Sequence, residues 1–207
     1  MIIKVLSKMV SITFGLMILA MGVVMYLKSG LGVDSFTVFC EGLSKTLGVS
    51  IGSALQIFLM LLVLVVFFID RSRLGIGTIM HALLVGFFID LLLRLNIPSP
   101  QNIIISFIVL LMGILCVGSG LAIYIRAGMG AGAVDAIMMI VYKKLNINLK
   151  WAKLGIDSVL AGTGFLMGGS LGIGTVLGVL LTGTIVETIL KLLNSAQPSS
   201  RGNNALL

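Results

Sequence analysis

The sequence predicts an all-α, polytopic membrane protein built from two tandem pseudo-symmetric repeats. Of its 207 residues, 58% are hydrophobic and 10% are charged, whereas soluble domains are about 25% charged. The mean hydropathy is +1.21. Apolar stretches near or above the ~18–20 residues needed to cross a bilayer occupy residues 10–27, 51–69, 76–93, 103–125, 152–167 and 173–190.

The repeats are indicated by the pentapeptide LGIGT, which occurs at 74–78 and again at 171–175. A shift of 97 residues aligns 74–93 with 171–190 and places Asp90 on Glu187. A shift of 98 residues aligns Gly15, Gly22 and Tyr26 with Gly113, Gly120 and Tyr124. Similarity in register over two blocks predicts an internal duplication. We therefore expect a first repeat at 1–95, a linker at 96–102, a second repeat at 103–193 and a disordered tail at 194–207.

Each half has the same expected order of elements. A long apolar helix ends in YLKSGLG or YIRAGMG, and its Tyr and basic residue are typical of a membrane interface. A glycine-rich break follows, then a short helix (35–47 or 134–145) and two further spans. The short helices would reach about 20 Å, less than a ~30 Å hydrocarbon core. If they do not cross, each half has three spans and the repeats are inverted; if they cross, each half has four and the repeats are parallel.

The net charge of +7 does not indicate nucleic-acid binding. The basic residues lie in short loops and at span ends, where they set the orientation of the protein in the membrane. The strongest cytoplasmic marker is the basic cluster Lys143, Lys144, Lys150 and Lys153, and Lys4 and Lys8 place the N-terminus on the same side. We expect a multi-pass protein of the inner (cytoplasmic) membrane with lipid as its surroundings.

The glycine motifs carry a resemblance to a known family. GLG at 30–32 and GMG at 128–130 follow the first span of each half, and GT at 77–78 and 174–175 opens a later one. With two weakly similar halves, this pattern resembles the YczE/YyaS/YitT group of bacterial integral membrane proteins. The resemblance covers most of residues 10–190 and implies a location and a topology class, not a substrate.

The helix breaks are the first candidate site, and they admit two interpretations. Thr78 and Thr175 are expected to cap helices whose free amides and positive dipole ends hold an anionic group. Alternatively, each motif is a tight, capped turn between helices. The candidate residues are Gly30, Gly32, Gly75, Gly77, Thr78, Gly128, Gly130, Gly172, Gly174 and Thr175.

Acidic residues inside apolar helices are the second candidate site, because a charge in the membrane is costly. Asp90 and Glu187 are each followed four residues later by a base, Arg94 and Lys191. That spacing predicts either an ion pair on one helix face or a coupling-ion site between the repeats. Asp157 has no acidic counterpart in the other half, and Lys153 is placed to pair with it.

Four further side chains complete the candidates. Asp34 and Asp135 follow the glycine breaks, where they either cap the short helices or line a cavity. Glu41, on the first short helix, is expected to face the same cavity. His81 is the single histidine, either a satisfied interior residue or a protonation switch.

These features predict a small-solute or ion secondary transporter or permease with a cavity between the two repeats. The alternative is a non-transporting membrane accessory or scaffold protein. The sequence offers no catalytic constellation, so we expect no enzyme activity, no cofactor and no metal site. The substrate is an unidentified small solute or ion, and a homo-oligomer is compatible with the sequence.

Overall fold

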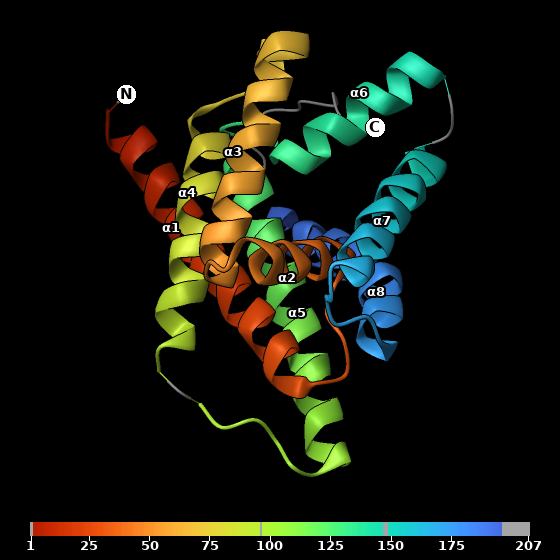
Figure 1. Cartoon of the computed structure of the whole chain (residues 1–207). Coiled ribbons are helices and arrows are strands. Elements are labelled where there is room, and N and C mark those ends of the chain that lie inside the picture. Colours follow the sequence, from red (N-terminus) through yellow and green to blue (C-terminus); the bar gives the residue numbers. More distant parts are fainter. Residues whose placement is uncertain (1, 96, 147–148, 196–207) are drawn as a thin grey trace.

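The computed structural model describes residues 2–95, 97–146 and 149–195, and within these ranges the chain forms only helices and their connections (Figure 1). The all-α class predicted from the sequence is therefore confirmed. In chain order the elements are α1 (Ile2–Ser29), α2 (Ser35–Leu47), α3 (Ile51–Asp70), a 3₁₀ turn η1 (Arg71–Arg73), α4 (Ile76–Leu93), α5 (Ile103–Ala127), α6 (Ala133–Leu145), α7 (Leu149–Leu166) and α8 (Ile173–Ser195).

The two short helices lie close to their expected bounds. Helix α2 matches 35–47, and α6 begins one residue earlier than expected. Helix α8 continues through Ser195, into the expected tail, and the rest of that tail (196–207) lies outside the described residues. Residue 96 of the expected linker lies outside them too, as does the side chain of Lys150.

Five of the described helices are long and apolar enough to cross a membrane: α1, α3, α4, α5 and α8. The sixth expected stretch, 152–167, falls in α7, which is not among the five. Large apolar side chains face outward, as shown by exposed fractions of 78% at Phe68 and 59% at Phe14. An apolar outer surface of this extent fits a lipid surrounding rather than water.

Helices α1 and α5 pack against each other through glycines and run in opposite directions. A Cβ atom on Gly15 would lie 2.9 Å from the Gly120 carbonyl oxygen, and one on Gly22 would lie 2.7 Å from that of Gly113. Because the residue number rises on α1 as it falls on α5, the two helices are antiparallel (Figure 1). Small residues at these crossings let two backbones approach closely.

The sequence indicated that the tyrosines at the ends of these two helices anchor the protein at the membrane interface. The structure instead places both of them in the interior of the protein. Tyr26 and Tyr124 are exposed by 0% and 1%. Tyr26 packs among Val33, Val38 and Leu110, and the Tyr124 hydroxyl donates to the Gly130 carbonyl at 3.1 Å. The expectation was wrong because the glycine breaks fold back over the helix ends and cover both rings.

Successive long helices run in alternating directions. In Figure 1, α1 runs from top to bottom, α3 runs upward, α4 runs downward and α5 runs upward again. Helix α2 lies across the bundle between α1 and α3 instead of crossing it (Figure 1). The chain thus passes through the bundle three times before α5 begins.

Candidate functional site

The GIGT segment at the start of α4 is bound to the glycine break that follows α5. The Gly77 amide donates to the Met129 carbonyl at 2.8 Å, and the Thr78 hydroxyl donates to the Ala131 carbonyl at 2.7 Å. The same hydroxyl accepts from the Gly75 amide at 3.2 Å. This set of bonds, which we call the α4 clamp, joins the first half of the chain to the second.

An equivalent set, the α8 clamp, joins the start of α8 to the break that follows α1. The Gly174 amide donates to the Leu31 carbonyl at 2.8 Å, and the Thr175 hydroxyl donates to the Val33 carbonyl at 2.6 Å. The Gly172 amide donates to the Thr175 hydroxyl at 3.2 Å. Each residue of one clamp has its counterpart 97 or 98 positions away in the other.

The clamps correct the expected role of the two threonines. Helix α4 has Gly75 as its N-cap, so Thr78 is the third residue of the helix, as Thr175 is in α8. Their hydroxyls and the neighbouring glycine amides bind protein carbonyls. The remaining break glycines take part in or lead into these contacts: Gly32 (φ +97°) against Gly172, Gly130 (φ +128°) against Gly75, and Gly30 and Gly128 in left-handed conformations just before them.

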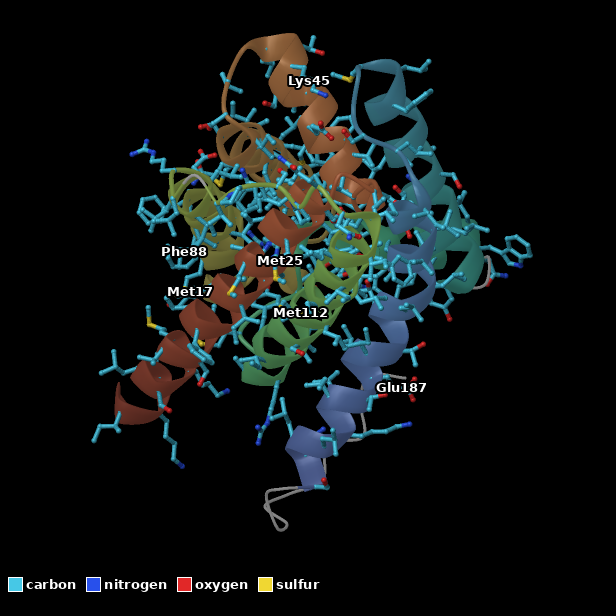
Figure 2. The ribbon with its side chains drawn as sticks, turned by 90° about the horizontal axis from the view of Figure 1, so that it is seen from below. Met17, Met25, Lys45, Phe88, Met112 and Glu187 are labelled. Carbon is cyan, nitrogen blue, oxygen red and sulfur yellow. The ribbon has the colours of Figure 1, made fainter. Side chains whose placement is uncertain are left out.

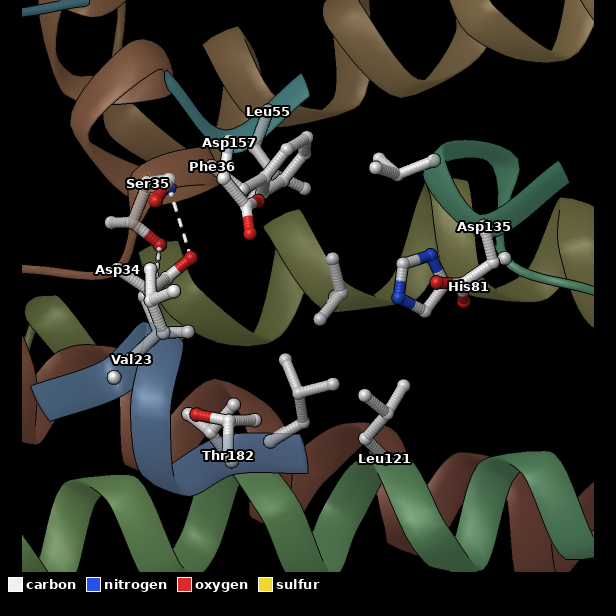
Figure 3. Close-up of a pocket in the computed structure, with 18 of the residues that line it drawn as sticks. Val23, Asp34, Ser35, Phe36, Leu55, His81, Leu121, Asp135, Asp157 and Thr182 are labelled. Atoms are coloured by element: carbon white, nitrogen blue, oxygen red, sulfur yellow. Dashed lines mark hydrogen bonds between the residues drawn. The ribbon is translucent and has the colours of Figure 1, made fainter. Parts of the chain in front are cut away.

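A cavity of about 190 Å³ lies between the halves and is lined by residues of all eight α-helices (Figure 3). Its walls are mostly aliphatic, with Leu19, Val23, Val85, Val117 and Leu121 among them. The titratable groups that line it are Asp34, His81, Asp135, Lys153 and Asp157. The sequence nominated four of these five as site residues and placed the fifth, Lys153, as the partner of Asp157.

Asp34 reaches the cavity from the N-cap of α2. Its carboxylate accepts from the Thr37 amide at 3.2 Å and from the Thr37 hydroxyl at 2.6 Å. Burial raises the pKa of Asp34 above its ordinary value, and the nearby charge of Asp157 raises it further against the opposing effect of these hydrogen bonds. Asp34 therefore both caps a helix and lines the cavity.

Asp135 and Asp157 approach the cavity from α6 and α7. Burial raises the pKa of Asp135; Lys153 opposes this shift and Asp157 reinforces it. The Lys153 ammonium lies 3.0 Å from Asp157 Oδ2, with side chains exposed by 52% and 15%. The expected Lys153–Asp157 ion pair is thus present, and it extends from the cavity toward the surface of the protein.

Two buried polar atoms at or beside the cavity, Tyr26 Oη and His81 Nδ1, have no hydrogen-bond partner among the described residues. The Tyr26 hydroxyl lies against Gly178, 2.6 Å from where a Cβ would be, and Gly178 lines the cavity. The His81 ring lies 5.2 Å from the Tyr124 ring. Buried polar groups are normally paired, so this arrangement is suited to a bound polar molecule or water.

Asp90 and Glu187, aligned in sequence, have different surroundings, and neither lines the cavity. Asp90 accepts from the Ser50 hydroxyl and, at 2.9 Å, from the Gly52 amide, so it holds the start of α3. The expected ion pair with Arg94 is absent from the described contacts, because the α3 terminus occupies the carboxylate. Glu187 does pair with Lys191 at 2.6 Å, but it projects outward from α8 and its side chain is 67% exposed (Figure 2).

Glu41 also lies away from the cavity, contrary to expectation. It accepts from the Ser170 amide at 2.7 Å, the Ser170 hydroxyl at 2.9 Å and the Lys45 ammonium at 2.9 Å. Lys45 also donates to the Gly168 carbonyl at 2.6 Å. We call these contacts the α2 latch. The sequence analysis missed Lys45 and Ser170, although the four-residue spacing from Glu41 to Lys45 is a readable signal.

Similar proteins support a membrane location and carry no assigned activity. An uncharacterized membrane protein YczE of Bacillus subtilis is 32% identical over 174 residues, covering 84% of this chain and 80% of that protein. An uncharacterized protein of Haemophilus influenzae is 29% identical over 180 residues, covering 87% and 82%. An uncharacterized protein YyaS of B. subtilis is 24% identical over 178 residues, covering 85% and 89%.

No solved structure matches the chain. A family model described as a family of unknown function, DUF6198, matches residues 6–191. This match spans almost all of the helical part of the chain, and the relatives YczE and YyaS bear the names of the group that the glycine motifs resemble. The chain therefore belongs to the DUF6198 family of YczE- and YyaS-like membrane proteins.

Proposed function

We propose that this protein is a secondary transporter or permease for a small solute or ion, with its binding site in the cavity between two inverted repeats. The observation that carries the proposal is the convergence of Asp34, Asp135 and Asp157 on one mostly aliphatic cavity that both halves line. Transporters built from repeats bind their substrates where interrupted helices of the two halves meet, and intramembrane acids commonly mark ion or substrate pathways.

The inverted arrangement is supported by the paired contacts. Helices α1 and α5 are antiparallel. The two clamps are reciprocal, because each half contributes a helix start to one clamp and a glycine break to the other. Two equal units related in this way have opposite orientations across a membrane. Three passes per half then account for the alternation of α1, α3, α4 and α5 (Figure 1).

The distribution of basic residues favours a cytoplasmic N-terminus in an inner membrane. Ser7, Lys8, Arg126 and Leu193 line one pocket, so the start of α1 and the ends of α5 and α8 lie at the same end of the bundle. The Arg73 carbonyl accepts from the Ala131 amide at 3.3 Å, which brings the α3–α4 turn to the break after α5. Basic residues gather on the cytoplasmic side of membrane proteins.

The test is solute movement across a membrane that contains the purified protein. Proteoliposomes would be offered a panel of small metabolites and ions, with and without a proton gradient. Asp157→Asn should reduce the flux at least tenfold, because it removes one of the three carboxylates that line the cavity. Glu187→Gln, the same chemical change on an exposed acid, should leave the flux unchanged. Absence of any protein-dependent flux across the panel would favour the non-transporting accessory role.

A further inference from the structure

The cavity has an excess of acidic over basic groups. Asp34, Asp135 and Asp157 line it, against one lysine, Lys153, and one histidine, His81. Lys153 is already paired with Asp157 at 3.0 Å. Among the described residues, Asp34 and Asp135 have no ion-pair partner, since every ion pair found there involves other acids. The cavity is therefore electrostatically suited to a positive charge.

The acids are spread around the cavity instead of meeting at one point. Figure 3 shows Asp34 and Asp135 at opposite ends of the cavity, with Asp157 on the Asp34 side. Within the described residues no three His, Cys, Asp or Glu side chains are grouped closely enough to hold a metal ion. A bare ion would contact one carboxylate at a time, whereas a cation with some bulk would lie between two of them.

The walls and the size of the cavity define the rest of the ligand. Apart from the acids the lining is mostly aliphatic, with Leu19, Val23, Val85, Val117 and Leu121. Its volume of about 190 Å³ is below the ~300–1,000 Å³ of pockets for drug-sized ligands. A ligand of only a few heavy atoms that carries alkyl groups fits both properties, because apolar surface gains free energy against these walls.

Tyr26 gives independent support for a polar ligand at the Asp34 end. Its side chain is 0% exposed and its hydroxyl has no described hydrogen-bond partner. The hydroxyl lies against Gly178, which itself lines the cavity. The Thr182 side chain lies beside it and also lines the cavity, so this end of the cavity offers hydroxyl groups to a polar ligand.

We propose that the cavity binds a small organic cation of the alkylammonium or quaternary ammonium class, with its charge between Asp34 and Asp135 and its alkyl groups against the aliphatic walls. The proposal rests on the transport function proposed above and names its substrate class. Binding should strengthen as pH rises, because protons compete with the cation for the two carboxylates. The other titratable groups around them are Tyr26 of α1, Cys40 of α2, His81 of α4, Tyr124 of α5, and Lys153 and Asp157 of α7.

The experiment compares three probes of similar shape and different charge: tetramethylammonium, tert-butanol and pivalate. Equilibrium dialysis and thermal unfolding would be measured on the purified full chain in detergent. Tetramethylammonium should bind and raise the unfolding temperature, and the neutral and anionic probes should not. Asp34→Asn and Asp135→Asn should each weaken binding at least tenfold, and Glu187→Gln should leave it unchanged. Asn is itself a good N-cap, so Asp34→Asn keeps the start of α2 intact.

Three results would overturn the cation assignment: equal or tighter binding of pivalate or tert-butanol, no binding of tetramethylammonium, or unchanged binding in both Asn variants. If an Asn variant does not fold, the wild type decides, since binding that is independent of pH would also overturn it. Flux in proteoliposomes separates this assignment from the transport proposal. Binding without flux keeps the cation site and removes transport, whereas flux of an anion or neutral solute keeps transport and removes the cation site.

Discussion

The junction between the halves has two ends, one beside α2 with the α8 clamp and one beside α6 with the α4 clamp. The two clamps are made of equivalent residues, but the side chains around them differ. At the α2 end, Glu41 and Lys45 bind the segment 168–170 through three hydrogen bonds and pair with each other. Their counterparts 98 residues later are Met139 and Lys143, and among the described residues no ion pair occurs there. An apolar groove of about 390 Å³ lies instead between α3, α6 and α7.

The comparison shows that the clamps hold both ends of the junction, whereas the α2 latch is found at one end only. The clamps use backbone groups and a threonine, so they can be formed equally well in both halves. The latch uses a buried carboxylate, which is stable only where several donors surround it. We therefore expect the α2 end to be held closed and the α6 end to be the more easily opened of the two.

The largest effect is expected from crowding the clamps. A Cβ on Gly75 would overlap the Met129 carbonyl, and one on Gly172 would overlap the Leu31 carbonyl. Gly75→Ala and Gly172→Ala should each lower the free energy of unfolding by about 3 kcal/mol, because a backbone atom cannot move aside cheaply. Thermal or denaturant unfolding in detergent measures this. Gly183→Ala on α8, which has open space around it, is the control and should not destabilise. Unequal losses at Gly75 and Gly172 would contradict the equivalence of the clamps.

Removing the latch should have the next largest effect. Glu41→Ala removes the acceptor of the Ser170 amide and leaves the Lys45 ammonium with the Gly168 carbonyl, and should cost about 2 kcal/mol of unfolding free energy. Cys40, buried beside Glu41 on α2, should also react faster with a thiol reagent in this variant. Glu187→Ala, at an exposed acid, should cost less than about 0.5 kcal/mol. An unchanged Cys40 rate would show that the latch does not hold α2.

The two lysines at equivalent positions offer a smaller and more selective comparison. Lys45→Met removes a half-exposed partner of Glu41 and of the Gly168 carbonyl, and should cost about 0.5–1 kcal/mol. Lys143→Met, at the α6 end, should be neutral in the same unfolding measurement. Equal costs for the two changes would mean that the ends do not differ in the way their contacts indicate.

The sequence predicted the parts of the molecule that depend on local signals. Apolar length marked five helices that the structure also identifies as spans, and the glycine breaks located the short helices α2 and α6 to within a residue. Asp34, Asp135, Asp157 and His81 were nominated because polar residues stand out in an apolar chain, and the structure brings all four to one cavity.

The partners of these residues were less accessible to sequence reasoning, because they come from distant segments. Ser170 is 129 residues from Glu41 and Ser50 is 40 residues from Asp90, so both acids were assigned to the wrong surroundings. Tyr26 and Tyr124 were misplaced for the same reason. The local sequence of a helix end does not show whether a following segment folds back over it and buries it.

Acidification should have the smallest effect on the free energy of unfolding. The part of this effect that comes from the α2 latch is obtained by comparison with a variant that lacks the Glu41 charge. Burial by itself would raise the pKa of Glu41, but the Lys45 ammonium and the Ser170 amide and hydroxyl outweigh it and hold the pKa below its ordinary value. A carboxyl with a lowered pKa in the folded state contributes stability above the pKa of the unfolded chain, and this contribution is lost as pH falls through the folded pKa. Wild-type protein should therefore lose stability below about pH 4.

Glu41→Gln is the reference for this titration, because Asp34 and Asp135, whose pKa values are raised, act in the opposite sense at higher pH and are present in both proteins. The difference in unfolding temperature between wild type and Glu41→Gln should shrink as pH falls from 6 to 3. The change should remain smaller than that of Glu41→Ala, since a protonated carboxyl still accepts from the Ser170 amide. A difference that stays constant over this range would mean that the Glu41 charge contributes nothing to holding α2 on the 168–170 segment.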